Sequence, residues 1–433
     1  MTIKIYLPYN LITMLVVSYS PNLKGEVEIS ASKNAALPIV SANYILDEQI
    51  NLVNKPNIAD INLLDKIFHQ AKEVSNNYFD LTMPETAKLR GCILLIPYGL
   101  LNYGEVRLGG SGGCNLGKRP LDMFDDGFKQ AGVDVVIDPE TGMKTYTVVG
   151  KPKKNIMMGG FAVTAIEALV TYLAFLQDVD YPITIYQVAI EPNVQDLIHF
   201  LNQAGADISL HHDHTLTINP KKITKEKIAN TEYQIISDYI EAGTYFAIGA
   251  GADNSEITIK NVHVDDLSSM YALANKIGID YKIIDKNTIR VSSKNKANYQ
   301  ASKLEARIYP GFPTDLQSIW ATLMTQCHGI SRVFETMYEG RFSFLGELDN
   351  LGADSEVLNP HQAIIVGPAA LKGAYVASKD LRCGASMILA GIMAQGDTHI
   401  LYEKMIFRGY ENIIEKLKNI GVNIKIEREK IRG

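Results

Sequence analysis

Apolar and polar positions along this chain follow a pattern that returns about every 72 residues. An amphipathic helix runs into a glycine turn and then into an alternating strand five times, with turn glycines at Gly132, Gly205, Gly278, Gly352 and Gly421. The intervals between successive glycines are 73, 73, 74 and 69 residues. This period predicts six units in 433 residues, the first of them degenerate around residues 72–81.

A second kind of helix recurs with the same period and is apolar on nearly every side. The pattern predicts six such helices, near residues 34–46, 90–101, 160–176, 241–252, 315–327 and 384–396. A helix that is hydrophobic all round has no face for water and must be enclosed. The alternating strands keep a polar outer face, which is typical of a sheet with one side in solvent. We therefore expect an α/β protein with three buried helices walled by sheets in each of two domains.

Composition limits the classes of function that this chain can serve. Its length suits two domains, and its 46% hydrophobic and 21% charged residues are typical of a globular protein. A net charge of −6 argues against a nucleic-acid surface, which is usually basic. The four cysteines show no CxxC spacing, so we expect neither a zinc site nor disulfides, and a reducing, cytoplasmic setting.

Two local stretches resemble a membrane span and a metal site, but we predict neither. Residues 5–19 form an apolar run of 15 residues with Pro8 and Asn10 inside it, which is too short to span a bilayer. We expect residues 14–30 to form two strands joined by a turn, and residues 1–13 to be a dispensable extension. The run HHDH at 211–214 predicts a hairpin turn rather than a metal site, because adjacent histidines on a tight turn rarely converge on one ion.

Charged and polar residues gather where the buried helices begin. They are Lys33, Asn34, Arg90, Asp238, Glu241, Asp315, Asp380 and Arg382. Helix capping is a sufficient explanation for the acids, Asp315 included. The cations fit that explanation badly, because a positive charge at a helix N-terminus opposes the helix dipole. Cations and several helix N-termini facing one cleft between the domains would instead bind a highly charged anion such as a phosphate ester.

Five motifs occur in an order that identifies a family. They are GEVEISASKNAALPI (25–39), GGSGGCNLGKRPLD (109–122), FPTDLQ (312–317), KDLRCGASMILAG (379–391) and FRGYENIIEKLKNIGVNI (407–424). From about residue 14 to the C-terminus, the chain resembles the UDP-N-acetylglucosamine enolpyruvyl transferases, within the enolpyruvyl transferase superfamily. This superfamily has a two-domain inside-out α/β barrel fold built from six repeats. The resemblance implies a first domain over 33–236 and a second over 14–32 plus 237–433.

The reaction that the resemblance implies is transfer of the enolpyruvyl group of phosphoenolpyruvate to the 3'-hydroxyl of UDP-N-acetylglucosamine. Phosphate is released, no metal or organic cofactor takes part, and the product enters peptidoglycan synthesis. Cys114 matches the family's loop cysteine, which acts as a general acid. Its thiol suits proton transfer near neutral pH, and Lys118 and Arg119 should lower its pKa. Asp315 matches the acid that takes the acceptor's proton, and Lys33 completes the catalytic set.

The resemblance also assigns the binding residues. Those for phosphoenolpyruvate are Lys33, Asn34, Arg90, Arg119, Asp380, Arg382 and Arg408, with Arg341 in support. Those for the acceptor are Arg119, Pro120, Leu121, Asp122, Gly160, Asp315 and Met337. The glycine-rich stretch around Cys114 is interpreted as a lid over the anion. Cys92, Cys327 and Cys383 lie in apolar helix patterns and are expected to be packing residues.

Three departures from the family pattern all fall on the acceptor side. Phe124 stands where a histidine is usual, Ile156 and Met158 replace a lysine and a serine, and Ser111 replaces a proline. One interpretation is a different nucleotide or nucleotide-sugar acceptor for the same chemistry. Another is drift, with Lys153 or Lys154 supplying the charge. A third possibility is a non-catalytic relative that binds a nucleotide sugar, although such a protein would be expected to lose Cys114, Asp315 or Lys33.

Overall fold

The computed structural model describes residues 10–109, 121–221, 223, 228–229 and 231–431. Within them the chain forms two compact units. Unit 1 holds the described residues up to 30 and those from 239 onward, and unit 2 holds the described residues between. The chain passes from one unit to the other at 30/31 and again at 238/239, whereas the sequence analysis places these boundaries at 32/33 and 236/237.

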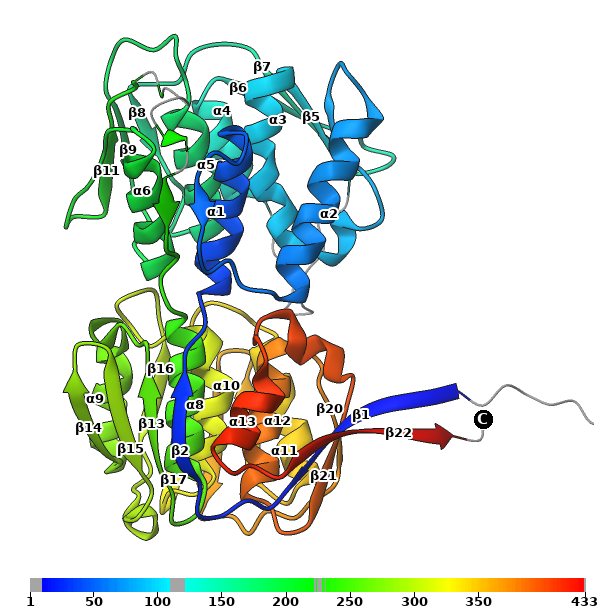
Figure 1. Ribbon diagram of the computed structural model, residues 1–433, viewed down its shortest axis with the longest axis vertical. Coiled ribbons are helices and arrows are strands. Elements are labelled where there is room, and N and C mark those ends of the chain that lie inside the picture. Colours follow the sequence, from blue (N-terminus) through cyan, green and yellow to red (C-terminus); the bar gives the residue numbers. More distant parts are fainter. Residues whose placement is uncertain (1–9, 110–120, 222, 224–227, 230, 432–433) are drawn as a thin grey trace, which may run out of the picture. The chain divides into compact units, whose positions relative to one another are not determined.

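Unit 1 is built around three helices with no solvent-facing side (Figure 1). They are α8 (Tyr239–Gly251), α10 (Thr314–Met324) and α12 (Leu381–Met393). Small residues let these helices approach closely. A Cβ on Gly243 of α8 would lie 2.4 Å from the side chain of Leu316 on α10, so only glycine fits there. The all-round apolar pattern therefore correctly predicts enclosed helices in this unit.

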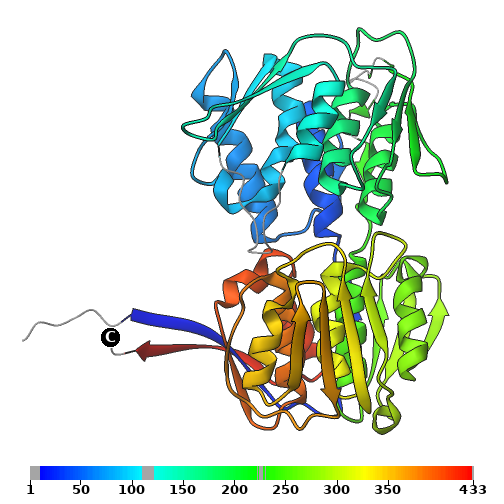
Figure 2. The ribbon, with the colours of Figure 1, turned by 180° about the vertical axis from the view of Figure 1, so that it is seen from behind.

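Three four-stranded sheets wall these helices, and the rear view in Figure 2 shows the second of them in front of the helices. The first has the order β14-β15-β13-β2, formed by β2 (Lys24–Glu28), β13 (Glu256–Lys260), β14 (Asp280–Asp285) and β15 (Thr288–Ser292). The second has the order β16-β17-β19-β18, formed by β16 (Lys303–Ala306), β17 (Gly329–Glu335), β18 (Asp354–Asn359) and β19 (Gln362–Gly367).

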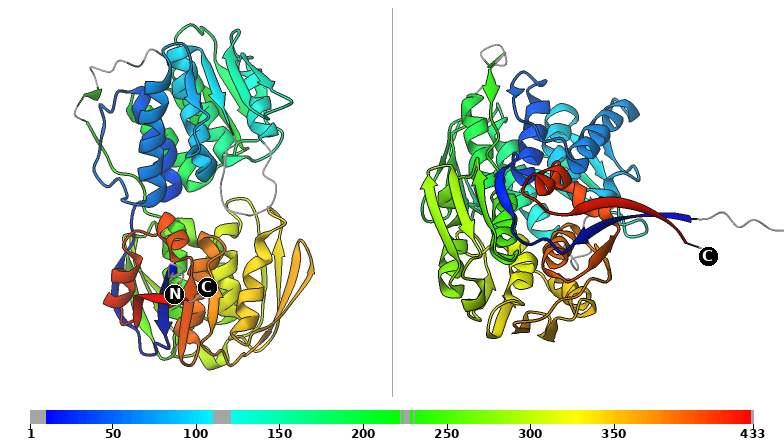
Figure 3. Two further views of the ribbon diagram at one scale, coloured as in Figure 1. Left: turned by 90° about the vertical axis from the view of Figure 1, so that its right-hand side faces the viewer. Right: turned by 60° about the horizontal axis from the view of Figure 1, so that its bottom comes forward.

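The third sheet of unit 1 joins the two ends of the described chain. Its order is β20-β21-β1-β22, formed by β1 (Asn10–Ser18), β20 (Tyr375–Ala377), β21 (Asp397–Leu401) and β22 (Ile424–Ile431). Figure 3 shows β1 and β22 running side by side beyond the other strands. Residues 10–13 belong to β1 and pair with residues 428–431. The sequence analysis expected the first strand to begin at residue 14, and that boundary is wrong; that residues 1–13 are dispensable stays a prediction. The strands β1 and β2 do occur as expected, but each pairs with other strands.

Unit 2 has the same arrangement of inner helices and outer sheets, but in its described residues the third sheet has only two strands. Its inner helices are α1 (Lys33–Ile45), α3 (Ile96–Tyr103) and α5 (Val163–Ala174). One four-stranded sheet, β4-β5-β7-β6, consists of β4 (Phe79–Leu81), β5 (Glu105–Leu108), β6 (Val133–Ile137) and β7 (Lys144–Val148). The other, β10-β11-β9-β8, consists of β8 (Asn155–Met157), β9 (Ile183–Tyr186), β10 (Ile208–Leu210) and β11 (Thr215–Ile218). A two-stranded parallel pair consists of β3 (Asn51–Leu52) and β12 (Glu232–Tyr233).

The helix expected over residues 90–101 is divided in the structure. A 3₁₀ helix, η2 (Arg90–Leu95), precedes α3, and Pro97 stands near the start of α3. Proline has no N–H to donate to the carbonyl one turn earlier, so the α-helical hydrogen bond is missing at this position. The tighter 3₁₀ hydrogen bonds complete the preceding turn.

Amphipathic helices form the outer connections, and the turn glycines end all of them except α2. The outer helices are α2 (Ala59–Val74), α4 (Asp122–Gln130), α6 (Pro192–Gln203), α9 (Ser268–Ile277), α11 (Leu345–Asn350) and α13 (Ile413–Asn419). All five turn glycines have φ between 85° and 105°, a left-handed conformation that favours glycine. The run HHDH lies in the turn between β10 and β11, as expected. Over the described residues, no helix has the length and apolarity needed to cross a membrane.

Candidate active site

Asp315 lies at the start of α10 in unit 1, where two buried arginines hold its carboxylate. The N-cap of the helix is Pro313, so the interpretation of Asp315 as a capping residue is wrong. Arg341 donates an ion-paired hydrogen bond to one carboxylate oxygen of Asp315, and Arg382 donates to the other at 2.8 Å. The arginine side chains are 3% and 6% exposed, whereas that of Asp315 is 28% exposed. The carboxylate is therefore oriented by two ion pairs, on a side chain that remains partly exposed.

Each arginine is also anchored by a hydroxyl group. Arg341 begins the 3₁₀ helix η5 (Arg341–Phe344), and its Nε donates to Thr314 Oγ1 at 3.1 Å. Thr314 in turn donates to Glu335 Oε2 at 2.7 Å. On the other side, Arg382 Nη1 donates to the Tyr410 hydroxyl at 3.1 Å. Buried guanidinium groups need such partners because an unpaired buried charge is costly.

Glu335 accepts hydrogen bonds from several groups of this site. It is fully buried at the end of β17, and its second oxygen accepts from the backbone N–H groups of Met337 (2.6 Å) and Tyr338 (3.1 Å). Gln317 of α10 donates to the same oxygen as Thr314, at 3.0 Å. This carboxylate thus fixes the turn that carries Met337, a residue assigned to the acceptor.

The other donor-binding candidates of unit 1 have clear local positions. Asp380 is the N-cap of α12, and one of its oxygens accepts from the backbone N–H groups of Arg382 (2.7 Å) and Cys383 (2.9 Å). The capping interpretation therefore holds for Asp380. Its negative charge at the helix N-terminus offsets the cation of Arg382 two residues along. Arg408 is the last residue of the 3₁₀ helix η6 (Glu403–Arg408) and is half-buried.

The cations of unit 2 lie at the starts of its inner helices. Lys33 is the first residue of α1, after the N-cap Ser32, and its ammonium group forms an ion pair of 2.6 Å with Asp60 of α2. The backbone N–H of Lys33 donates to Asp238 at 3.3 Å. Asp60 is 3% exposed and Lys33 14% exposed, so this pair is almost removed from water. Asn34 follows in the first turn of α1, and Arg90 begins η2.

The expected lid and part of the acceptor set fall outside the described residues. Ser111, Cys114, Lys118, Arg119 and Pro120 lie there, so their expected roles stay predictions. Leu121 precedes α4 and Asp122 is its first residue. Gly160 is partly exposed and lies against the side chain of Met123, which a Cβ at Gly160 would meet at 3.0 Å.

The residues that depart from the family pattern belong to the core of unit 2. Phe124 is 3% exposed and stacks on Phe128 with ring centroids 4.7 Å apart. Ile156 and Met158 are 0% and 1% exposed. These side chains pack against apolar neighbours, so they give no support to an altered acceptor site.

The three cysteines expected to be packing residues are buried. Burial raises the pKa of Cys92, Cys327 and Cys383 to about 12 in each case, despite the opposing charge of Arg90 near Cys92. Their thiols therefore remain protonated and unreactive at neutral pH.

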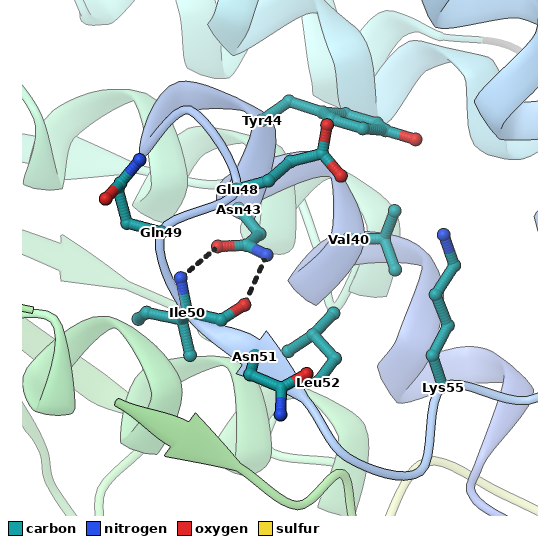
Figure 4. A pocket seen from close by; sticks show the side chains of 9 residues that line it. All are labelled: Val40, Asn43, Tyr44, Glu48, Gln49, Ile50, Asn51, Leu52 and Lys55. Carbon is teal, nitrogen blue, oxygen red and sulfur yellow. Dashed lines mark hydrogen bonds between the residues drawn. The ribbon is translucent and has the colours of Figure 1, made fainter. Parts of the chain in front are cut away.

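A pocket of about 340 Å³ lies apart from the candidate residues, at the C-terminal end of α1 (Figure 4). Asn43 and Lys55, which line it, already have partners. The amide of Asn43 bonds both the N–H and the carbonyl of Ile50, at 3.4 and 2.9 Å. Lys55 forms an ion pair of 2.8 Å with Asp65. These contacts give no reason to assign this pocket to a ligand.

Three residues of the site were missed by the sequence analysis, and two of them carried a signal. Glu335 occupies a buried position in the alternating strand β17, where an acid is unexpected. Asp60 lies on the apolar face of α2 with Ile61 and Leu64. Tyr410 follows Arg408 closely but has no distinguishing spacing.

The sequence and the architecture match a known family of enzymes. The family model for EPSP synthase (3-phosphoshikimate 1-carboxyvinyltransferase) matches residues 17–417, and the chain belongs to this family. Among solved structures, the enolpyruvyl transferase NikO from Streptomyces tendae has a TM-score of 0.82 at 20% identity, covering 98% of this chain and all of that one. An EPSP synthase from Acinetobacter baumannii has a TM-score of 0.69 at 12% identity, covering 96% of this chain and all of its own. These likenesses show the inside-out α/β fold.

More similar sequences carry one particular name. The UDP-N-acetylglucosamine 1-carboxyvinyltransferase of Pseudothermotoga lettingae is 34% identical over 95% of this chain and 99% of its own. That of Staphylococcus haemolyticus, designated 1, is 33% identical over 94% of this chain and 96% of its own.

Proposed function

We propose that this protein transfers the enolpyruvyl group of phosphoenolpyruvate to the 3'-hydroxyl of UDP-N-acetylglucosamine, with release of phosphate. The reaction would take place in the cytoplasm as the first committed step of peptidoglycan synthesis. The observation that carries the proposal is the Asp315 carboxylate, oriented by two buried guanidinium groups on a side chain that remains partly exposed. Full-length relatives at 33–34% identity named for this reaction support the choice of acceptor.

The proposed chemistry assigns each group a role. Cys114 gives its proton to the methylene carbon of the enol while the acceptor oxygen bonds to the neighbouring carbon. Asp315 takes the proton of the acceptor hydroxyl. In the second step the new methyl group loses a proton, the bond to the phosphate oxygen breaks, and phosphate leaves. Lys33, Arg90, Arg119, Arg382 and Arg408 neutralise the carboxylate and phosphate of the donor, with Asn34, Asp380 and Arg341 in support.

The acceptor would be held by the residues that the resemblance assigns to it. These are Arg119, Pro120, Leu121, Asp122, Gly160, Asp315 and Met337. The fixed turn at Met337 and the close packing at Gly160 suit this role, because recognition needs rigid backbone. A different acceptor is not favoured, since Phe124, Ile156 and Met158 are core residues.

Phosphate release tests the proposal. Phosphoenolpyruvate is incubated with the protein and with UDP-N-acetylglucosamine, UDP, UMP, shikimate 3-phosphate or no acceptor. We expect release with UDP-N-acetylglucosamine alone. Release with another acceptor only would contradict the acceptor assignment, and absence of release with every acceptor would contradict the transferase function.

A further inference from the structure

Arg382 is anchored in a way that the family resemblance does not assign. It is the second residue of α12, where the helix dipole disfavours a cation, and it is 5% exposed. One terminal nitrogen donates to Asp315 and the other to the Tyr410 hydroxyl. An arginine has five N–H donors and no acceptor, so the Tyr410 oxygen must be the acceptor in that contact.

The Tyr410 hydroxyl also contacts a hydroxyl of a neighbouring helix. Tyr410 is 2% exposed, and its oxygen lies 3.0 Å from Thr244 Oγ1 on α8. Thr244 donates its own proton to the carbonyl of Ile240 at 2.9 Å. The Thr244 oxygen is therefore left to accept from Tyr410. A one-way chain of donors runs from Arg382 through Tyr410 and Thr244 to the backbone of α8.

The two arginines are thus held in parallel ways. Arg341 is tied through Thr314 to Glu335, and Arg382 is tied through Tyr410 to Thr244. Each arginine uses another nitrogen for Asp315. With both guanidinium groups anchored, both oxygens of Asp315 have a fixed direction, which proton transfer requires.

We propose that Tyr410 is a positioning residue whose hydroxyl holds the Arg382 guanidinium against Asp315. The expected effect of Tyr410 on turnover rests on the proposed transferase function. Without the hydroxyl, Arg382 keeps its charge but loses the hydrogen bond to Tyr410, and the orientation of Asp315 is less well defined. Because Arg382 is also assigned to the donor, binding of phosphoenolpyruvate weakens as well.

The test compares Tyr410→Phe with wild type and with Tyr402→Phe, a matched control in the neighbouring segment whose side chain is exposed. We expect Tyr410→Phe to lower kcat roughly tenfold, the worth of one hydrogen bond to a charged group. The Kd of phosphoenolpyruvate, measured by calorimetry without acceptor, should rise several-fold. The KM for UDP-N-acetylglucosamine and the melting temperature should stay close to wild type, and Tyr402→Phe should match wild type throughout.

Thr244 provides a second pair of variants. Thr244→Val keeps the shape but removes the acceptor, so we expect a smaller loss of kcat, roughly two- to threefold. Thr244→Ser keeps a hydroxyl and should retain most activity. A Tyr410→Phe enzyme equal to Tyr402→Phe in kcat and donor Kd would overturn the proposal. A parallel fall in melting temperature and in both substrate affinities would also overturn it, because that pattern indicates a general packing defect.

The donor measurement separates this proposal from the proposed function. Weakened phosphoenolpyruvate binding in Tyr410→Phe, with no transfer by wild type, would support the anchor and contradict the transferase function. Normal transfer by wild type, with kcat and Kd unchanged in Tyr410→Phe, would contradict the anchor alone.

Discussion

At the scale of single residues, the candidate site depends on the negative charge of Asp315. Its carboxylate is the acidic partner of two arginines whose side chains are 3% and 6% exposed. An asparagine has the same shape and cannot balance these charges. Removing one partner of a buried ion pair leaves the other uncompensated, which costs more than the pair itself is worth.

Asp315→Asn should therefore affect both activity and stability. We expect kcat to fall at least about 100-fold through loss of the general base. We expect the free energy of unfolding to fall by about 1–3 kcal/mol, a value reduced because Asp315 is partly exposed. Turnover assays and urea unfolding measure the two effects.

A matched acid in the same unit serves as control. Glu305 on β16 also pairs with two cations, Lys303 and Arg307, at the surface. Glu305→Gln should change stability by less than about 1 kcal/mol and leave turnover unchanged. Near-normal turnover of Asp315→Asn would exclude Asp315 as the base.

The sequence identified the site residues better than it identified their contacts. The motifs single out Asp315, Arg341 and Arg382, and the structure brings these three together. Glu335 and Tyr410 were missed because their importance arises from side chains distant in sequence. The burial of Phe124 and Met158 in the core was not predicted, because a local motif does not show which way a side chain points.

At the scale of elements, a buried carboxyl group joins α5 to the start of α6. Glu167 is 3% exposed, and its Oε1 accepts from Asn193 Nδ2 at 2.6 Å. Burial, reinforced by the nearby charge of Glu191, raises the pKa of Glu167 from its ordinary value of 4.5 to about 8, although the Asn193 bond opposes the shift. Glu167 is therefore a neutral acid in the folded protein at neutral pH.

This shift makes the stability of unit 2 depend on pH. The unfolded chain loses the Glu167 proton near pH 4.5 and the folded chain near pH 8. Between these values the folded state binds more protons, so stability falls as pH rises. Glu167→Gln cannot ionise and keeps the oxygen that accepts from Asn193. We expect its urea midpoint to exceed that of wild type by an increasing margin from pH 5 to pH 8.

One control variant makes this comparison specific. Glu140→Gln, at an exposed acid in the turn between β6 and β7, should follow the wild-type pH profile. Equal pH dependence in wild type and Glu167→Gln would show that Glu167 does not carry the effect.

The order of elements follows from the sequence more readily than the pairing of strands. Glycine turns and all-round apolar helices are local patterns, so the inner helices and all five turns were predicted. The pairing of β1 with β22 joins segments some 400 residues apart, and no local pattern specifies it. The split between η2 and α3 depends on Pro97, whose effect the apolar pattern concealed.

At the scale of the whole molecule, two units of similar plan carry different chemical groups. Unit 1 holds Asp315 with Arg341, Arg382 and Arg408, and unit 2 holds Lys33 with Asn34 and Arg90. The chain passes between the units twice. The proposed reaction needs both sets, so neither unit alone should carry out the transfer.

The most direct measurement is mass spectrometry of the acceptor after incubation with phosphoenolpyruvate and the protein, followed by NMR of the product. We predict that UDP-N-acetylglucosamine gains one enolpyruvyl group, attached through an ether bond at the 3'-oxygen, and that Asp315→Asn yields little of it. An unmodified acceptor in the presence of active, folded protein would contradict the account. Attachment at another oxygen would contradict the assigned role of Asp315.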